Sequence, residues 1–281
     1  MSNPTLAEIW RYPVKSCGGE RLSAVSVGPT GLAGDRAWAA VDTETGLVAS
    51  AKRPDRWKAL LTTSVATEGS TPILTTPDGR SAPLSDPIAV ADLLSDLAGR
   101  RVLVSKAQDI AEPTLSRTDP DLRALLERGE VRLTDAVDDG LAGAAPSGTV
   151  FDYASVHLIS TPTLAAIEAE GGETAGDVRR FRANLVLDVD GPAFQEADWQ
   201  DRTLAIGDDV ELGVFMQSPR CAIPTLAQAD LPRSTATARA VAALNRIDVE
   251  GLGTYVCAGA YAAIRTGGVL REGATVQVID T

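Results

Sequence analysis

The chain has 281 residues, of which 44% are hydrophobic, so it can build either one large domain or two ordinary domains with packed cores. Its 38 acidic and 26 basic side chains give a formal net charge of −12, which argues against bulk electrostatic binding to nucleic acid or to an anionic membrane. The three cysteines have no close pair along the sequence, which argues against a disulfide-stapled secreted protein.

The first ten residues have no basic start and no apolar stretch of signal length. No segment approaches the roughly 18 consecutive apolar residues of a membrane span. We therefore expect a cytoplasmic protein without membrane association.

The first hundred residues predict short strands separated by turns that contain glycine. The expected strands are apolar or β-branched runs at 6–10, 21–27, 36–42 and 57–66. The stretch 77–80 predicts a hairpin turn. A helix follows, with Asp86 as its N-cap, Pro87 at its first position and Gly99 at its end. Its expected buried face consists of Ile88, Val90, Leu93, Leu94 and Leu97.

Residues 105–148 are the least regular part of the sequence. A helix is predicted to begin at Asp119, and the Gly-, Ala- and Pro-rich stretch 140–148 is typical of a linker. We therefore expect an N-terminal β domain at 1–105, an irregular connecting segment at 106–148 and a second domain at 149–281.

The second half again predicts strands with a few helices. A strand at 156–159 leads into a helix with Thr161 as N-cap, and the free backbone N–H groups of such a helix start make Ser160 and Thr161 candidate anion ligands. A cap alone would also explain Thr161. A later helix is expected to start at Ser234 and to continue through Ile247. The remaining expected strands lie at 184–188, 203–206, 209–215, 254–264 and 275–279, which makes the fold class α+β and β-rich.

Cys221 is the strongest candidate for chemistry because it directly follows Arg220 at the end of an apolar run. A neighbouring cation favours the thiolate, which is a nucleophile and a soft metal ligand. A lone cysteine is otherwise a small buried hydrophobe, which is how we interpret Cys257. The single histidine, His157, lies in an apolar strand, so it is interpreted as a hydrogen-bonded core residue, and His-rich metal sites are excluded.

Arg182 and Asn184 alternate in an apolar run, so both are expected on one face of a strand, either lining a cavity or forming an ion pair at its rim. Lys15, Ser16 and Arg36 lie in turns, where a solvated lysine and an exposed arginine are the alternatives to a binding role.

Four short motifs together resemble the MOSC family, which is named for the C-terminal domain of molybdenum cofactor sulfurase. They are YPVKS at 12–16, GDR at 34–36, RFRANLVLD at 180–188 and SPRC at 218–221, and the closing segment 253–278 is also similar. The nearest members look like the mitochondrial amidoxime-reducing component and its bacterial relatives. The resemblance implies a MOSC-type β-barrel with a smaller N-terminal β domain and a few surface helices.

The resemblance also implies a molybdenum cofactor, Mo-molybdopterin, with Cys221 as the catalytic residue and protein ligand of the metal. The residues that match the family's cofactor-binding positions are Lys15, Ser16, Arg36, Ser160, Thr161, Arg182, Asn184, Ser218 and Arg220. Arg220 has two other possible roles, which are stabilising the thiolate and pairing with a carboxylate.

The implied activity is reduction of small N-hydroxylated compounds to amines or amidines plus water. Three cysteines are too few for a four-thiolate iron–sulfur cluster, so a separate flavoprotein, ferredoxin or cytochrome is the expected electron donor. The alternative is a sulfur carrier or sulfurtransferase that uses a Cys221 persulfide. A third possibility is a cofactor-binding module without turnover.

Overall fold

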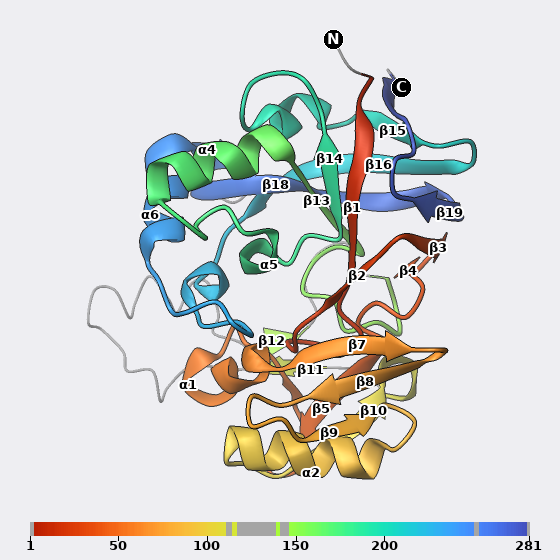
Figure 1. The fold of residues 1–281 in the computed structure, drawn as a ribbon, viewed down its shortest axis with the longest axis vertical. Coiled ribbons are helices and arrows are strands. Elements are labelled where there is room, and N and C mark those ends of the chain that lie inside the picture. The colour runs from red at the N-terminus through yellow and green to blue at the C-terminus, as the bar shows by residue number, and fades with distance from the viewer. Residues whose placement is uncertain (1–2, 111–113, 117–138, 141–145, 250–252, 280–281) are drawn as a thin grey trace. The chain divides into compact units, whose positions relative to one another are not determined.

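The computed structural model describes residues 3–110, 114–116, 139–140, 146–249 and 253–279 (Figure 1). The helix predicted to begin at Asp119 and most of the predicted linker at 140–148 lie outside the described residues. The chain divides into two compact units. Unit 1 contains residues 1–11, 19–35 and 154–281, and unit 2 contains residues 12–18 and 36–153.

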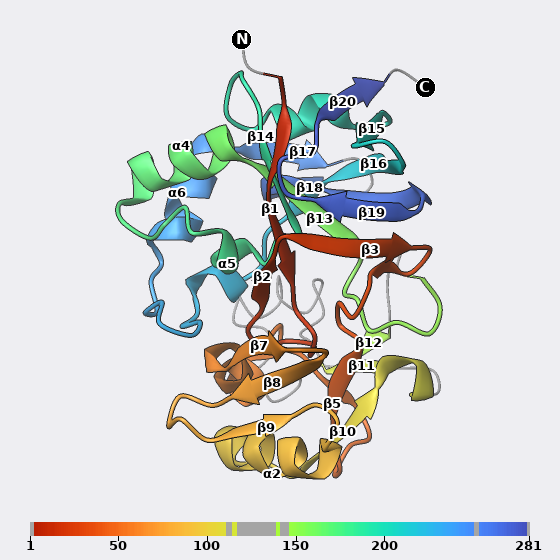
Figure 2. The ribbon, with the colours of Figure 1, turned by 45° about the vertical axis from the view of Figure 1, so that its right-hand side comes forward.

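Unit 1 is built around a barrel of antiparallel and parallel strands (Figure 2). Neighbouring strands follow the order β1 (Thr5–Arg11), β14 (Leu185–Asp188), β13 (Val156–Ser160), β18 (Gly253–Thr266), β16 (Val210–Pro219), β15 (Thr203–Ile206) and β20 (Val276–Ile279). A bridge between Thr5 and Thr275 joins the last strand to the first, and the Val276 N–H donates to the Pro4 carbonyl at 2.8 Å. The expected closed β-barrel is therefore confirmed.

Further short strands extend the edges of unit 1. β2 (Glu20–Leu22) pairs with β1, and β17 (Arg246–Val249) pairs with β18. A separate three-stranded sheet has the order β19 (Gly268–Arg271), β3 (Ala24–Gly28) and β4 (Gly31–Leu32). The run expected as one strand at 21–27 is thus split between two sheets.

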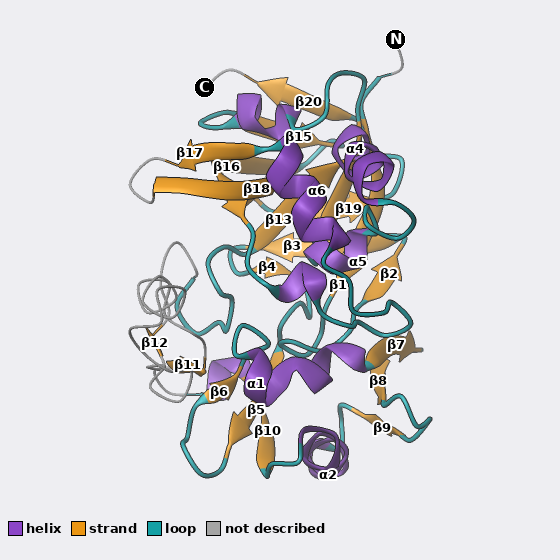
Figure 3. Ribbon diagram, turned by 90° about the vertical axis from the view of Figure 1, so that its left-hand side faces the viewer, coloured by secondary structure: helices purple, strands orange, loops and turns teal. Residues whose placement is uncertain are grey.

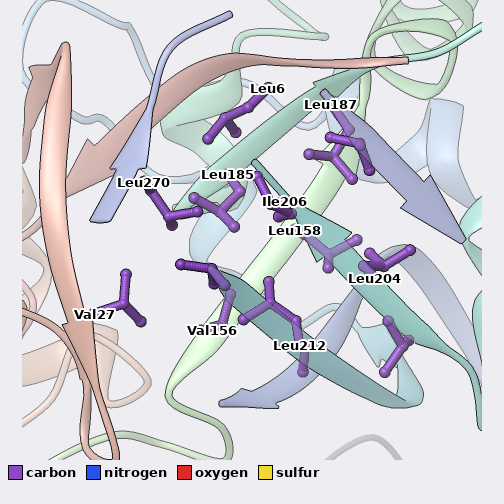
Figure 4. Packing of buried hydrophobic residues seen from close by; sticks show 14 of the residues in the cluster. Leu6, Val27, Val156, Leu158, Leu185, Leu187, Leu204, Ile206, Leu212 and Leu270 are labelled. Carbon is purple, nitrogen blue, oxygen red and sulfur yellow. The ribbon is translucent and has the colours of Figure 1, made fainter. Parts of the chain in front are cut away.

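Alternation along the barrel strands separates the inner and outer side chains. Leu185 and Leu187 of β14 and Leu158 of β13 point into a cluster with Leu204 and Leu212 (Figure 4). Burial of each such side chain contributes about 2 kcal/mol to folding. The barrel interior is therefore a packed core.

Three helices cover the outer face of the same strands (Figure 3). They are α4 (Thr161–Gly171), α5 (Val178–Phe181) and α6 (Ala236–Leu244), with short 3₁₀ turns η4 (Gln195–Trp199) and η5 (Ile223–Thr225). Ile159 and Val186 face these helices, whereas Leu158, Leu185 and Leu187 face the barrel interior. The expected surface helices are confirmed.

Two helix starts differ from the sequence prediction. The N-cap of α4 is Ser160, whose Oγ accepts from the Thr163 N–H, so Thr161 is the first helical residue. Helix α6 begins after Thr235 and ends at Leu244, while Ile247 belongs to β17. The pairing of β17 with β18 satisfies the backbone after Leu244, which is why the helix ends earlier than its apolar spacing suggests.

Unit 2 combines a five-stranded sheet with a three-stranded antiparallel sheet. The larger sheet has the order β10 (Val102–Lys106), β5 (Trp38–Asp42), β6 (Val48–Ala49), β11 (Thr114–Ser116) and β12 (Asp139–Gly140). The smaller has β7 (Ser64–Glu68), β8 (Thr71–Thr75) and β9 (Ser81–Pro83), and the hairpin turn predicted at 77–80 joins its last two strands.

The described residues of unit 2 contain the helices α1 (Pro54–Trp57) and α2 (Pro87–Ala98), with 3₁₀ turns η1 (Lys58–Thr62) and η2 (Ala107–Asp109). The strand predicted at 57–66 is therefore wrong in its first half. Pro54 starts a helical turn, and Trp57, Leu60 and Leu61 are buried at helical rather than alternating spacing.

Helix α2 has both predicted caps. Asp86 Oδ1 accepts from the Ala89 N–H at 3.0 Å, and Gly99 is left-handed with φ 65°. Ile88, however, is 75% exposed, so its predicted place on the buried face is wrong. It lies in the first turn, on the side opposite to the buried Val90 and Leu94.

Unit 1 is discontinuous in sequence, because it combines N-terminal segments with the C-terminal half of the chain. Segments 1–11 and 19–35 pack with residues 154–281, because β1 pairs with β14 and β3 pairs with β19. The boundaries at 105 and 148 stay a prediction. None of the helices in the described part of the chain is long and apolar enough to cross a membrane.

Candidate functional site

Cys221 lies two residues beyond the end of β16, just before the 3₁₀ turn η5. It is partly exposed, whereas Cys17 and Cys257 have no exposed surface. Burial raises the pKa of the Cys257 thiol to about 11, against the opposing charge of Arg220. Cys257 is therefore a protonated core thiol, and Cys221 is the cysteine that a ligand or reactant can reach.

The described residues offer no metal site made of several side chains. Nowhere among them do three His, Cys, Asp or Glu side chains gather in a way that could hold a metal ion. A soft metal bound at Cys221 would then have to take its other ligands from a non-protein molecule.

Arg220 connects three segments of unit 1. Its guanidinium donates to the Phe181 carbonyl at 2.8 Å and to Ser218 Oγ at 2.7 Å, and it lies 3.3 Å from His157 Nε2. It also sits 5.6 Å from the centre of the Phe181 ring. None of these partners is a carboxylate, so the alternative role of Arg220 in an ion pair with a carboxylate is not seen among the described residues.

Asn184 is buried, with 1% of its surface exposed, and its amide is engaged on both sides. Oδ1 accepts from the His157 N–H at 3.2 Å, while Nδ2 donates to Asp35 Oδ2 at 3.0 Å and to the Trp10 carbonyl at 3.2 Å. Since both Nδ2 hydrogens are used, Asn184 retains only acceptor capacity at Oδ1 for a bound molecule.

Arg182 does not lie in the strand that contains the residues after Asn184. It is the C-cap of α5, with a left-handed φ of 56°, and β14 begins only at Leu185. The predicted alternation of Arg182 and Asn184 along one strand face is therefore wrong. The helical turn before them was not visible in the apolar pattern.

Ser160 and Thr161 belong to a separate polar network around the start of α4. The Ser160 N–H donates to Glu196 Oε1 at 2.6 Å, and Thr163 Oγ1 donates to Glu196 Oε2 at 2.9 Å. Thr161 Oγ1 donates to Asp188 Oδ1 at 2.9 Å. Glu196 is 1% exposed, so the protein already supplies a negative charge at this helix start.

In unit 2, Lys15 is a buried cation, with 3% of its surface exposed. Its Nζ donates to Asp152 Oδ1 at 3.0 Å, and Lys52 Nζ lies 3.9 Å from the same oxygen. Burial lowers the pKa of Lys15 to about 8; Asp152 opposes this shift, and Lys52 and Arg36 add to it. The alternative of a solvated loop lysine is therefore wrong.

Ser16 and Arg36 adjoin Lys15 in left-handed conformations, with φ of 64° and 47°. Ser16 Oγ accepts from the Ala51 N–H at 2.9 Å. The Arg36 guanidinium lies 4.6 Å from the Tyr12 ring centre and 5.8 Å from that of Phe151, within cation–π range. Arg36 lies in the turn before β5 rather than at the strand start, and it is only partly exposed.

Within unit 1, the predicted residues do not form a single hydrogen-bonded group. Arg220 bonds to Ser218 and approaches His157, whose N–H donates to Asn184, and Cys221 is next in sequence to Arg220. Ser160 and Thr161 have other partners. The prediction of His157 as a hydrogen-bonded core residue is confirmed. Its contact with Arg220, and the contacts of Asp35 and Asp152, were not predicted, since nothing in a single apolar strand or an isolated Asp indicates which distant side chain it contacts.

Gly259 allows the close approach of β18 to His157. A Cβ at this position would lie 2.4 Å from the Leu158 carbonyl oxygen and 2.6 Å from His157 Nε2, and φ is 76°. We expect Gly259→Ala to lower the free energy of unfolding by about 2 kcal/mol through strain and displacement of the ring. Urea unfolding of wild type and variant measures this loss of stability. The control is Gly253→Ala, because φ of Gly253 is also positive but no atom lies within 4 Å of an added Cβ. Equal losses in both variants would contradict the role of the close contact.

Comparison with known proteins gives two consecutive domain matches. A model of the MOSC N-terminal beta barrel domain matches residues 3–109, and a model of the MOSC domain matches residues 147–277. Together they span most of the chain.

Two curated relatives match at low identity. The molybdenum cofactor sulfurase of Danio rerio is 27% identical over 238 residues, which cover 78% of this chain and 28% of that protein. The mitochondrial amidoxime reducing component 2 of Bos taurus is 25% identical over 238 residues, which cover 79% of this chain and 66% of that protein. The chain thus spans less than two thirds of the length of either relative.

A crystal structure of the YUAD protein from Bacillus subtilis covers 99% of this chain and 96% of its own. The two chains are 9% identical, with a TM-score of 0.43.

Proposed function

The chain belongs to the family of proteins that join a MOSC N-terminal beta barrel domain to a MOSC domain, and from this premise we propose that it is a molybdenum-cofactor-dependent reductase of N-hydroxylated compounds. The observation that carries the proposal is the partial exposure of Cys221. The other cysteine of unit 1, Cys257, is buried and protonated. The relative named as an amidoxime reducing component supports the choice of reaction.

The donor set fits such a cofactor. One reachable sulfur, with no cluster of other metal-binding side chains among the described residues, suits a metal whose remaining sulfur ligands come from an organic dithiolene. When bound, the cofactor would pass two electrons to the N–O bond, and two protons from solvent would complete the amine or amidine and the water that is released.

The protein's own contribution would be to hold Cys221 and to supply cations. In unit 1, Arg220 ties the segment that carries Cys221 to the end of α5, and Arg182 at that end is a partly exposed cation suited to a phosphate. We propose cofactor contacts for Arg182, Ser218 and Arg220 on this basis.

Unit 2 offers a second set of cations. Lys15 and Lys52 both approach the carboxylate of Asp152, and the charges of Lys52 and Arg36 act on Lys15, so three cations lie near one another inside a strongly acidic chain. We propose that Lys15, Ser16 and Arg36 also serve the cofactor. We extend the proposal to Ser160, Thr161 and Asn184 from the family match alone, since their side chains already have partners within unit 1.

A second candidate function is that of a sulfur carrier. The relative named as molybdenum cofactor sulfurase favours it, as does an accessible thiol that needs no metal. In this reaction, the Cys221 thiolate would attack the outer sulfur of a donor persulfide, form a Cys221 persulfide and release the donor's thiolate.

The reductase also needs electrons from outside the chain. Three cysteines cannot hold a four-thiolate cluster, so we propose a separate flavoprotein, ferredoxin or cytochrome as electron donor. The cytoplasmic location remains part of the proposal.

The two functions separate in one experiment on protein made in a host that synthesises the cofactor. The reductase predicts about one molybdenum per chain and reduction of an aryl amidoxime with a chemically reduced viologen as donor. The carrier predicts no metal and a mass increase of one sulfur on Cys221 after incubation with a cysteine desulfurase and cysteine. An amidoxime turnover no faster than that of the dye alone, with or without metal, would reject the reductase.

A further inference from the structure

His157 is the one polar link in the Arg220 network that has no place in the proposed function. The ring is buried, with 6% of the residue exposed, and it packs edge-on against Tyr261 at 5.6 Å between ring centres. Its Nε2 lies 3.3 Å from an Arg220 guanidinium nitrogen and 3.2 Å from the Ala258 carbonyl oxygen. One nitrogen thus faces both a donor and an acceptor.

The charge of Arg220 decides between these two partners. A guanidinium has no acceptor and cannot lose its proton, so Nε2 can bond to it only through a lone pair. An N–H at Nε2 could donate to the Ala258 carbonyl, but its positive end would also face the Arg220 guanidinium. None of the described carboxylates pairs with that guanidinium, so the repulsion would not be offset. The neutral imidazole with its proton on Nδ1 is therefore the favoured form.

Arg220 depends on neutral acceptors to keep its direction. Its Nε is buried without a hydrogen-bond partner, so the guanidinium is held by Ser218, Phe181 and His157. Because Phe181 precedes Arg182 and Ser218 precedes Cys221, this clamp fixes the segment of the candidate cysteine against the segment of a candidate phosphate ligand. Loss of one acceptor would loosen both.

We infer that His157 is a positioning residue, which accepts a hydrogen bond from Arg220 and thereby holds the Cys221 segment at the end of β16. The inference rests on the proposed function only in taking Cys221 as the functional thiol. Its tests need no bound metal, so they stand or fall separately from the reductase and the carrier.

The first test is spectroscopic and uses the unaltered protein. Because the chain has a single histidine, labelling with ¹⁵N-histidine gives one imidazole spin system in a two-bond ¹H–¹⁵N correlation spectrum. The expected result at neutral pH is a protonated Nδ1 and an unprotonated Nε2. A proton on Nε2 would assign the ring to Ala258 instead and would overturn the inference.

The second test measures Cys221 alkylation by iodoacetamide in the metal-free protein, with the modified peptide identified by mass. His157→Leu removes the acceptor and keeps apolar volume, and we expect alkylation to accelerate about threefold to tenfold as the segment opens more often. His157→Gln restores an acceptor and should return the rate to within about twofold of wild type.

Thr237→Val is the matched control. It removes another buried polar group of unit 1, a hydroxyl without a partner, and has no link to Arg220. It should leave the alkylation rate unchanged. Equal rates in wild type and His157→Leu, or acceleration by Thr237→Val to the same degree, would overturn the inference. If His157→Leu does not fold, the inference is judged by the tautomer of His157 in the wild-type protein, as measured in the first test.

Discussion

A Cys221→Ser variant is expected to bind molybdenum at least about 100-fold more weakly than wild type and to lose amidoxime reduction with it. A serine hydroxyl stays protonated at neutral pH and offers a hard oxygen in place of a soft thiolate. Cys221 is the one thiol of unit 1 with exposed surface, so no neighbouring cysteine can replace it. Metal analysis of protein purified in parallel gives the ratio.

The matched control is Cys257→Ala, which removes the buried thiol of the same unit. It should keep its metal, although it loses some stability through the small cavity. Equal molybdenum in wild type and Cys221→Ser would show that this thiol does not hold the metal. Absence of metal from all three proteins, together with a persulfide on Cys221, would favour the sulfur carrier.

A Lys15→Met variant is expected to be more stable and less active than wild type. Burial lowers the pKa of Lys15 to about 8, so the folded state disfavours the charged amine that the unfolded chain keeps up to about pH 10.5. The charged lysine then costs roughly 3 kcal/mol below pH 8, and methionine of similar shape removes most of that cost. Loss of the Lys15 contact costs Asp152 little, since Lys52 Nζ still lies 3.9 Å from the same oxygen and 30% of the Asp152 side chain is exposed.

The gain has a defined pH dependence. Below pH 8 the lysine is charged in both states, so the difference between variant and wild type is largest. Between pH 8 and about 10.5 only the unfolded chain keeps the proton, so wild-type stability rises and the difference shrinks toward zero. Guanidinium unfolding of both proteins at pH 7 and pH 10 measures this.

Lys52→Met is the control for Lys15→Met, because Lys52 approaches the same carboxylate but is more exposed, at 26%. It should change stability by less than about 0.5 kcal/mol. A Lys15→Met variant that is less stable than wild type at pH 7 would show that the pair with Asp152 outweighs burial. Full cofactor retention in that variant would remove Lys15 from the proposed ligands.

The sequence predicted the ends of an element correctly where a capping residue within the same turn sets that end. The caps at Asp86 and Gly99 are as expected because a capping carboxylate and a left-handed glycine act within one turn. The strand predicted at 57–66 failed because a short apolar run fits either period, and Pro54 decided for a helix. Arg182 failed in the same way, at a helical turn of only four residues.

For the candidate site, the sequence by itself determined the family, through four motifs, and it supplied the candidate residues: the Cys221 thiol after an arginine and the cations in tight turns. Only the tertiary structure decided their states. It buried Lys15 against Asp152, exposed Cys221 while burying Cys257, and set His157 against Arg220. The physical reason is that burial and hydrogen bonding depend on partners 63 to 137 residues away, which no local pattern specifies.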